Sequence, residues 1–168
     1  MKVLVLGELQ VRELLTMPAC IGVMEEALAT LARGGYHQPL RRMMKPPGAE
    51  GLLGLMPAYR ASAGGSATGG GGAYGLKAVA VFPGNPAIGL DSHQGVVLLF
   101  SGTTGEPLAV MNASAITAIR TAAVSGVATK LLAREDADDL AIIGAGVQAR
   151  THLDAMSCAR PVRRARVA

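Results

Sequence analysis

The chain has 168 residues, of which 50% are apolar and only 3% aromatic, with no tryptophan. A chain of this length can bury a core in one domain, or in one domain and part of another, and here that core must be aliphatic. The scarcity of aromatic side chains argues against a protein that stacks on nucleic-acid bases. The formal net charge of +4 equals that of four arginines near the C-terminal end, which we expect to form a solvated face: Arg160, Arg163, Arg164 and Arg166.

The cysteines and histidines have no metal-ligand spacing, so no metal site is expected. They are Cys20, Cys158, His37, His93 and His152. Both thiols are expected to be buried and reduced. The N-terminal apolar run is too short for a signal peptide, and no stretch approaches the roughly 20 apolar residues of a membrane span. We therefore expect a soluble, cytoplasmic protein with no membrane and no nucleic-acid partner.

In chain order, a short first strand is followed by a helix over residues 16–33, with Thr16 as its cap and Pro18 in its first turn. Gly34 and Gly35 end this helix. Four apolar runs then predict strands of a mixed or antiparallel sheet, at residues 52–56, 76–82, 96–100 and 107–111. The glycine-rich segment 61–72 is expected to be a flexible surface connection, and residues 101–105 a hairpin turn.

A long helix is predicted over residues 113–133, with an aliphatic stripe that includes Ile119, Ala123 and Val127. Small residues beside the stripe, among them Ser125 and Gly126, would allow close packing. Polar residues follow the helix, so we expect a domain boundary near residue 134, between a domain of residues 1–134 and one of residues 135–168.

An apolar strand that begins at Leu140 runs into the pattern Gly-x-Gly-x-x-Ala at residues 144–149. Such a strand, turn and helix form the start of a dinucleotide-binding fold. In that fold the first glycine permits a tight exit from the strand, and the second lets the backbone approach a pyrophosphate. The N-terminus of the helix then offers free N–H groups to the phosphates.

An unpaired charge among apolar side chains is costly, which singles out Arg120 and Lys77, and Arg41 adds a third cation. Arg120 is on the long helix, Lys77 is inside the apolar run 76–82, and Arg41 comes from a separate segment. Each could simply extend to solvent. If two or three of them converge, they form a carboxylate site, which beside a dinucleotide turn favours hydride transfer to or from a small acid.

Eight motifs in combination resemble the ornithine cyclodeaminase and mu-crystallin family, which includes ketimine reductases and some alanine dehydrogenases. They are QPLR at 38–41, LMPAY at 55–59, GLK at 75–77, FPGN at 82–85, HQG at 93–95, TGEPLA at 104–109, ITAIRTAA at 116–123 and GAGVQA at 144–149. The resemblance runs over nearly all of the chain. It implies an α/β protein with an N-terminal mixed α+β substrate-binding and dimerisation domain, followed by the start of a Rossmann domain for NAD(P)(H), in a homodimer.

The resemblance also implies roles for single residues. Arg41, Lys77 and Arg120 match the positions that hold the substrate carboxylate, and Lys77 and Arg120 are the residues expected to be catalytic. The cofactor-binding positions are Ser92, His93, Arg120, Gly144, Ala145, Gly146, Val147, Gln148 and Ala149.

Two departures from the family pattern matter. Ornithine cyclodeaminases carry a glutamate where this chain has Gly54, so a diamine substrate would lose its charge partner. The family's dinucleotide domain also continues past the last residue of this sequence, so the chain as given is expected to be C-terminally truncated and inactive or very weakly active. We therefore expect the full protein to reduce a cyclic imino acid such as 1-pyrroline-2-carboxylate with NAD(P)H. Ornithine cyclodeamination, alanine dehydrogenation and non-catalytic ligand binding are the alternatives.

Overall fold

The structure, a computed structural model, describes residues 2–62 and 71–168. Most of the glycine-rich connection expected at 61–72 lies outside the described residues. The chain divides into two compact units, and we describe each by itself. Unit 1 comprises Met1–Val11 and Thr30–Ser114, and unit 2 comprises Arg12–Ala29 and Ala115–Ala168. The domain boundary expected near residue 134 stays a prediction.

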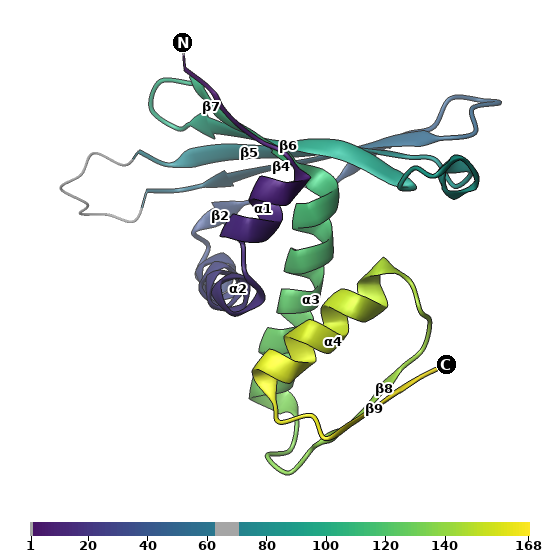
Figure 1. Ribbon diagram of the computed structural model, residues 1–168. Helices are drawn as coiled ribbons and strands as arrows, with labels where there is room; N and C mark the ends of the chain where they lie inside the picture. Colours follow the sequence, from purple (N-terminus) through teal and green to yellow (C-terminus); the bar gives the residue numbers. More distant parts are fainter. Residues whose placement is uncertain (1, 63–70) are drawn as a thin grey trace. The chain divides into compact units, whose positions relative to one another are not determined.

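Unit 1 contains a seven-stranded mixed sheet, as the apolar runs predict (Figure 1). The strand order is β1-β7-β6-β5-β4-β2, and β3 also pairs with β4. The β1 and β7 pair is parallel, and the other pairs are antiparallel. The strands are β1 (Leu4–Leu6), β2 (Tyr36–His37), β3 (Arg42–Met44), β4 (Leu52–Arg60), β5 (Ala73–Val81), β6 (His93–Ser101) and β7 (Pro107–Asn112).

The strand β4 continues through Pro57, beyond the end that the apolar run 52–56 predicts. A proline has no N–H group to give to a ladder, so it is tolerated only where one side of the strand is unpaired. This condition holds here, because β3 pairs with residues 53–55 and β2 pairs with Tyr59 and Arg60, and neither reaches Pro57.

Side chains alternate between the two faces of this sheet. On one face, which we name the Lys77 face, a cross-strand row contains Leu6, Met111, Val97, Lys77 and Met56. On the other, which we name the Tyr74 face, the neighbouring row is entirely apolar and contains Val5, Val110, Leu98, Leu76 and Pro57. Val79 and Ala109, each 6% exposed, belong to the Lys77 face, whereas Val5 on the Tyr74 face is 70% exposed.

The expected turn between β6 and β7 is confirmed. The Ser101 hydroxyl accepts hydrogen bonds from the N–H groups of Thr103 and Thr104, at 3.2 and 3.1 Å. Gly105 completes the turn with a φ of 73°, in the left-handed region that favours glycine.

Unit 2 combines helices with a parallel βαβ element. Helix α1 (Glu8–Leu14) runs from one unit into the other in sequence and is followed by α2 (Met17–Ala32) and α3 (Ala113–Leu132). Strand β8 (Asp139–Ile142), helix α4 (Val147–Ala159) and strand β9 (Arg164–Val167) complete the unit, with β8 and β9 parallel. Helices α2 and α3 agree with the expected segments to within one residue at each end, and α4 follows the glycine turn as the pattern predicts. The βαβ order is that with which a Rossmann-type domain begins.

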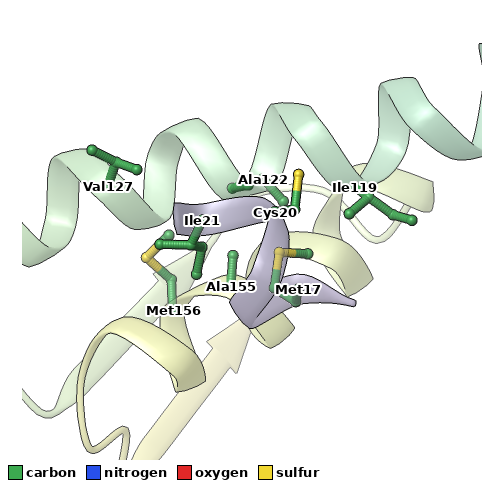
Figure 2. Close-up of a cluster of buried hydrophobic side chains, with 9 residues drawn as sticks. Met17, Cys20, Ile21, Ile119, Ala122, Val127, Ala155 and Met156 are labelled. Carbon is green, nitrogen blue, oxygen red and sulfur yellow. The ribbon is translucent and has the colours of Figure 1, made fainter. Parts of the chain in front are cut away.

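The core of unit 2 is a cluster of small and aliphatic side chains from three helices. Figure 2 shows these side chains gathered where α2, α3 and α4 meet. The cluster contains Met17, Cys20, Ile21, Ile119, Ala122, Ala123, Val127, Ala155 and Met156. Gly126 permits the close approach, because a Cβ there would lie 3.1 Å from Ile21 Cδ1 and 3.4 Å from the Ala155 carbonyl oxygen. The small-residue packing predicted for α3 is thus present at this position.

The structure corrects two expectations about single residues. Cys20 is buried, but Cys158 is exposed, because it follows the buried pair Ala155 and Met156 around α4 and falls on the outer side of that helix. Arg160 is not part of a solvated face: it donates hydrogen bonds to the carbonyl oxygens of Lys130 and Ala133 at the end of α3, at 3.2 and 2.8 Å.

The expectation that no stretch approaches the composition of a membrane span does not hold for α3. Among the described residues this helix is long and apolar enough to cross a membrane, with a mean hydropathy of 1.2, and the bent pair of α1 and α2 would qualify if counted as one segment. The core helix of a globular protein has the same composition, and α3 supplies Ile119, Ala122, Ala123 and Val127 to the core cluster.

Candidate functional site

The glycine turn of unit 2 has the geometry that a dinucleotide-binding turn requires. Gly144 has a φ of 99°, which a residue with a Cβ rarely adopts. Gly146 is the N-cap of α4, and no side chain caps the helix there. A Cβ on Gly146 would have nothing within 4 Å, so the backbone borders open space. The turn therefore leaves the positive end of the α4 dipole accessible to an anion.

A cavity of about 580 Å³ adjoins this turn. It is bordered by β8, by the first turns of α4 and by the middle of α3. Its polar side chains are Ser125, Thr129, Gln148 and His152, and Gly144 and Gly146 also line it. Two glycines of the dinucleotide pattern thus face a space large enough for part of a ligand.

Arg120 lies on α3 and is partly buried. Its guanidinium has no hydrogen-bond or ion-pair partner among residues 2–62 and 71–168. It acts electrostatically on Cys20 of the core cluster: burial raises the pKa of the Cys20 thiol, and the charge of Arg120 opposes that rise. A partly buried, unpaired guanidinium is suited to an anionic ligand.

The other two predicted cations belong to unit 1. Lys77 lies in the middle of β5, opposite Met56 of β4 and Val97 of β6. Arg41 comes directly before β3. The first residue of β3 pairs with Leu55 of β4, which is next to Met56 in the sequence. The sheet therefore brings Arg41 and Lys77 to the same region, two strands apart. Arg120 belongs to the other unit, so the meeting of all three is part of the proposal below.

Hydrogen bonds hold Ser92 and His93, some within the loop and one from the start of α3. After the 3-10 turn η1 (Asn85–Ile88), the Asn85 amide donates to the Asp91 carbonyl oxygen at 2.9 Å. Ser92 Oγ lies 3.0 Å from His93 Nδ1, and the Ser114 hydroxyl donates to the His93 carbonyl oxygen at 2.5 Å. His93 is on the Lys77 face, four residues along β6 from the partner of Lys77, which is about 13 Å.

Gly54 lies on the Lys77 face, two residues from Met56 in β4. A Cβ at this position would lie 3.2 Å from Met43 Sδ and 3.4 Å from the terminal methyl groups of Met43 and Met56. The space where a glutamate side chain would start is therefore occupied by two methionines. The residue opposite Lys77 on β4 is the apolar Met56.

Two residues that line the cavity were missed as a pair by the sequence analysis. Ser125 of α3 and His152 of α4 make a hydrogen bond across the helix interface, with 3.1 Å between Oγ and Nε2. In the sequence, Ser125 is visible only as a small packing residue of the long helix, and His152 has no partner at metal-ligand spacing. The spacing of Gln148 and His152, four residues on one helix, was the available signal.

Comparison with known proteins now decides the family, because a family model described as ornithine cyclodeaminase/mu-crystallin matches residues 1–168. The chain belongs to this family. The chain is 42% identical to the ketimine reductase mu-crystallin of Mus musculus over 134 residues, which are 78% of this chain and 40% of that protein.

Two solved structures of family members extend the comparison. The Thermococcus litoralis Delta(1)-pyrroline-2-carboxylate reductase, in complex with NADH and L-proline, matches 98% of this chain and 49% of its own, with 38% identity and a TM-score of 0.87. An archaeal alanine dehydrogenase dimer with bound NAD matches 99% of this chain and 48% of its own, with 33% identity and a TM-score of 0.88. The chain therefore spans about half the length of these family members.

Proposed function

We propose that the chain is part of an NAD(P)H-dependent reductase of small cyclic imino acids, such as 1-pyrroline-2-carboxylate. The observation that carries the proposal is the similarity, over 98% of the chain, to a reductase solved in complex with NADH and L-proline. L-proline has one ring and one carboxylate. The glycine turn of unit 2 and the closeness of Arg41 and Lys77 on the sheet of unit 1 support the same proposal.

The residues of unit 2 fit a nicotinamide dinucleotide. Gly144 makes the tight exit from β8, and Gly146 borders open space at the uncapped start of α4, where a Cβ would meet an approaching pyrophosphate. Ala145, Val147, Gln148 and Ala149 supply the rest of this turn, whose N–H groups would bind the phosphates. When bound, the reduced nicotinamide supplies a hydride. Ser92 and His93 are proposed to contact its nicotinamide end.

The chain's own cations would bind and orient the substrate. In the proposed site, Arg41, Lys77 and Arg120 hold its carboxylate, and Lys77 and Arg120 lie beside the reacting carbon and nitrogen. Charge-assisted hydrogen bonds from guanidinium and ammonium groups are about twice as strong as neutral ones. Holding the imine in a single orientation converts a bimolecular encounter into an ordered step, which contributes much of the rate.

The surroundings of Gly54 support a reductase over an ornithine cyclodeaminase. Met43 and Met56 fill this part of the Lys77 face and offer no carboxylate to the second ammonium group of a diamine. Alanine dehydrogenation is the second candidate, because a solved alanine dehydrogenase is as similar in fold as the reductase.

We infer further that the protein forms homodimers through the Tyr74 face. Val5, Tyr74 and Val96 on this face are 70, 52 and 38% exposed, although all are apolar or aromatic. A mainly apolar cavity of about 260 Å³, lined by Tyr59, Tyr74, Leu76 and Phe100 among others, opens on the same side of the sheet. Apolar surface of this kind marks interaction sites. The protein is proposed to be cytoplasmic, as suits an enzyme of small metabolites.

The test is oxidation of NADH and NADPH with 1-pyrroline-2-carboxylate, measured for this chain and for a version extended with the C-terminal half of a family member. We expect turnover at least in the extended version. Ammonia release from ornithine without added NADH, and no imine reduction, would favour the cyclodeaminase. Amination of pyruvate with ammonia and NADH would favour the alanine dehydrogenase.

A further inference from the structure

We propose that Ser125 and His152 are positioning residues, which hold the first turn of α4 against the helix that carries Arg120. This inference deepens the proposed function and rests on it, because the first turn of α4 is the proposed pyrophosphate site. Both helices belong to unit 2, so the argument needs no contact with unit 1.

Two hydrogen bonds connect α3 with the first turn of α4 through a single imidazole ring. His152 Nδ1 lies 2.7 Å from the carbonyl oxygen of Gln148, the second residue of α4. His152 Nε2 lies 3.1 Å from Ser125 Oγ on α3. The carbonyl oxygen of Gln148 can only accept, so Nδ1 carries a proton. In the neutral ring Nε2 is then the acceptor, and the Ser125 hydroxyl donates to it.

The location of these bonds makes them more than a general contact between helices. Gln148 lies inside the glycine pattern, two residues after Gly146 and directly before Ala149, the last residue of the pattern. Thr151 Oγ1 also donates to the Gln148 carbonyl oxygen, at 3.2 Å, but it makes no link to α3 that could take the place of His152. Ser125 is five residues after Arg120 on α3, about 7.5 Å along the helix axis. The imidazole therefore links the pyrophosphate turn to the element that presents Arg120.

The same helices have a second polar contact that serves as a matched control. Thr129 Oγ1 lies 3.1 Å from Met156 Sδ, one turn further from the glycine turn on both helices. Removing the Thr129 hydroxyl takes a weak bond from the same interface and leaves Gln148 untouched. If both contacts only stabilise the helix interface, their loss should speed hydrogen exchange at the start of α4 equally. If Ser125 and His152 position the first turn of α4, only their loss should speed it.

The experiment compares S125A, H152N and T129V with the unchanged 168-residue chain. Asparagine places its amide nitrogen where Nδ1 lies, so H152N keeps a donor for Gln148 and loses the reach to Ser125. Hydrogen exchange is measured for the amides of residues 150–153, which donate the helical hydrogen bonds to the carbonyl oxygens of residues 146–149. We expect exchange about tenfold faster in S125A and H152N, as for loss of one partly buried hydrogen bond, and less than twofold faster in T129V. The double variant S125A/H152N is expected to be no worse than either single one, because both remove the same link.

A second measurement follows NADH affinity by fluorescence titration in S125A and H152N, with S157A as the control. Ser157 donates to the Leu153 carbonyl oxygen on α4 and does not line the cavity, so we expect weaker binding in S125A and H152N and unchanged binding in S157A. Unchanged exchange in S125A, or faster exchange with unchanged NADH affinity, would overturn the positioning role. If the unchanged chain and its extended version both fail to bind NADH, the proposed function fails, and the exchange rates still decide whether Ser125 and His152 hold the turn.

Discussion

The two glycines of the dinucleotide turn should respond to alanine in opposite ways when stability is measured. Gly144 has a φ of 99°, where a residue with a Cβ costs about 1–2 kcal/mol. Gly146 has a φ of −79° and a ψ of −169°, which any residue adopts. A Cβ at either position has nothing within 4 Å, so backbone conformation alone separates the two variants.

We therefore expect G144A to lower the free energy of unfolding by about 1–2 kcal/mol. G146A is expected to leave it unchanged or raise it by about 0.4–1 kcal/mol, because alanine reduces the entropy of the unfolded chain. Urea unfolding followed by circular dichroism measures both, with a second spectroscopic probe to detect separate unfolding of the two units.

The binding measurement then separates the two roles. In the version extended with a family C-terminal half, G146A should bind NADH at least about tenfold more weakly, because its methyl group occupies the approach of the pyrophosphate. The reasoning is refuted if G146A loses as much stability as G144A, or if G146A binds NADH as tightly as the unchanged protein.

Three further predictions concern other parts of the chain. R160M should lower the free energy of unfolding by about 2 kcal/mol, because it removes the donor to two carbonyl oxygens at the end of α3. R163M removes only an exposed ion pair with Asp138 and should change this free energy by less than about 0.5 kcal/mol. Equal effects of the two variants in urea unfolding would contradict a capping role for Arg160. K77M should raise the KM for 1-pyrroline-2-carboxylate by about 30-fold or more, as for loss of a charge-assisted bond, without raising it for a neutral imine; a similar KM change for both would argue against the carboxylate role. L98E should shift the protein from dimer to monomer in analytical ultracentrifugation, because the carboxylate would be buried on the Tyr74 face, and an unchanged dimer would exclude that interface.

Much of the fold follows from local signals. Helix α2 has a glycine stop, α3 has sustained apolar periodicity and α4 follows the glycine pattern, and the structure confirms all three. Strands β2 and β3 were missed because two or three residues carry no measurable alternation. The extension of β4 through Pro57 was missed because it depends on a gap between two partner strands.

The candidate site could be predicted only as far as single residues carry an unusual charge or backbone. Gly144 and Lys77 are visible in the sequence for these reasons. The Ser125 and His152 pair depends on how two helices are rotated against each other, and the cap made by Arg160 depends on where α4 ends relative to α3. Local sequence patterns do not contain that information.

The central claim is that cations of this chain bind the carboxylate of a cyclic imine during its reduction. The most direct test is the ratio of kcat/KM for 1-pyrroline-2-carboxylate to that for 1-pyrroline, which has the same ring and no carboxylate, in the extended protein with NADH and NADPH. We predict a ratio of about 100 or more, as expected when charged partners are left without the group they bind. Equal kcat/KM values for the two imines would contradict the account.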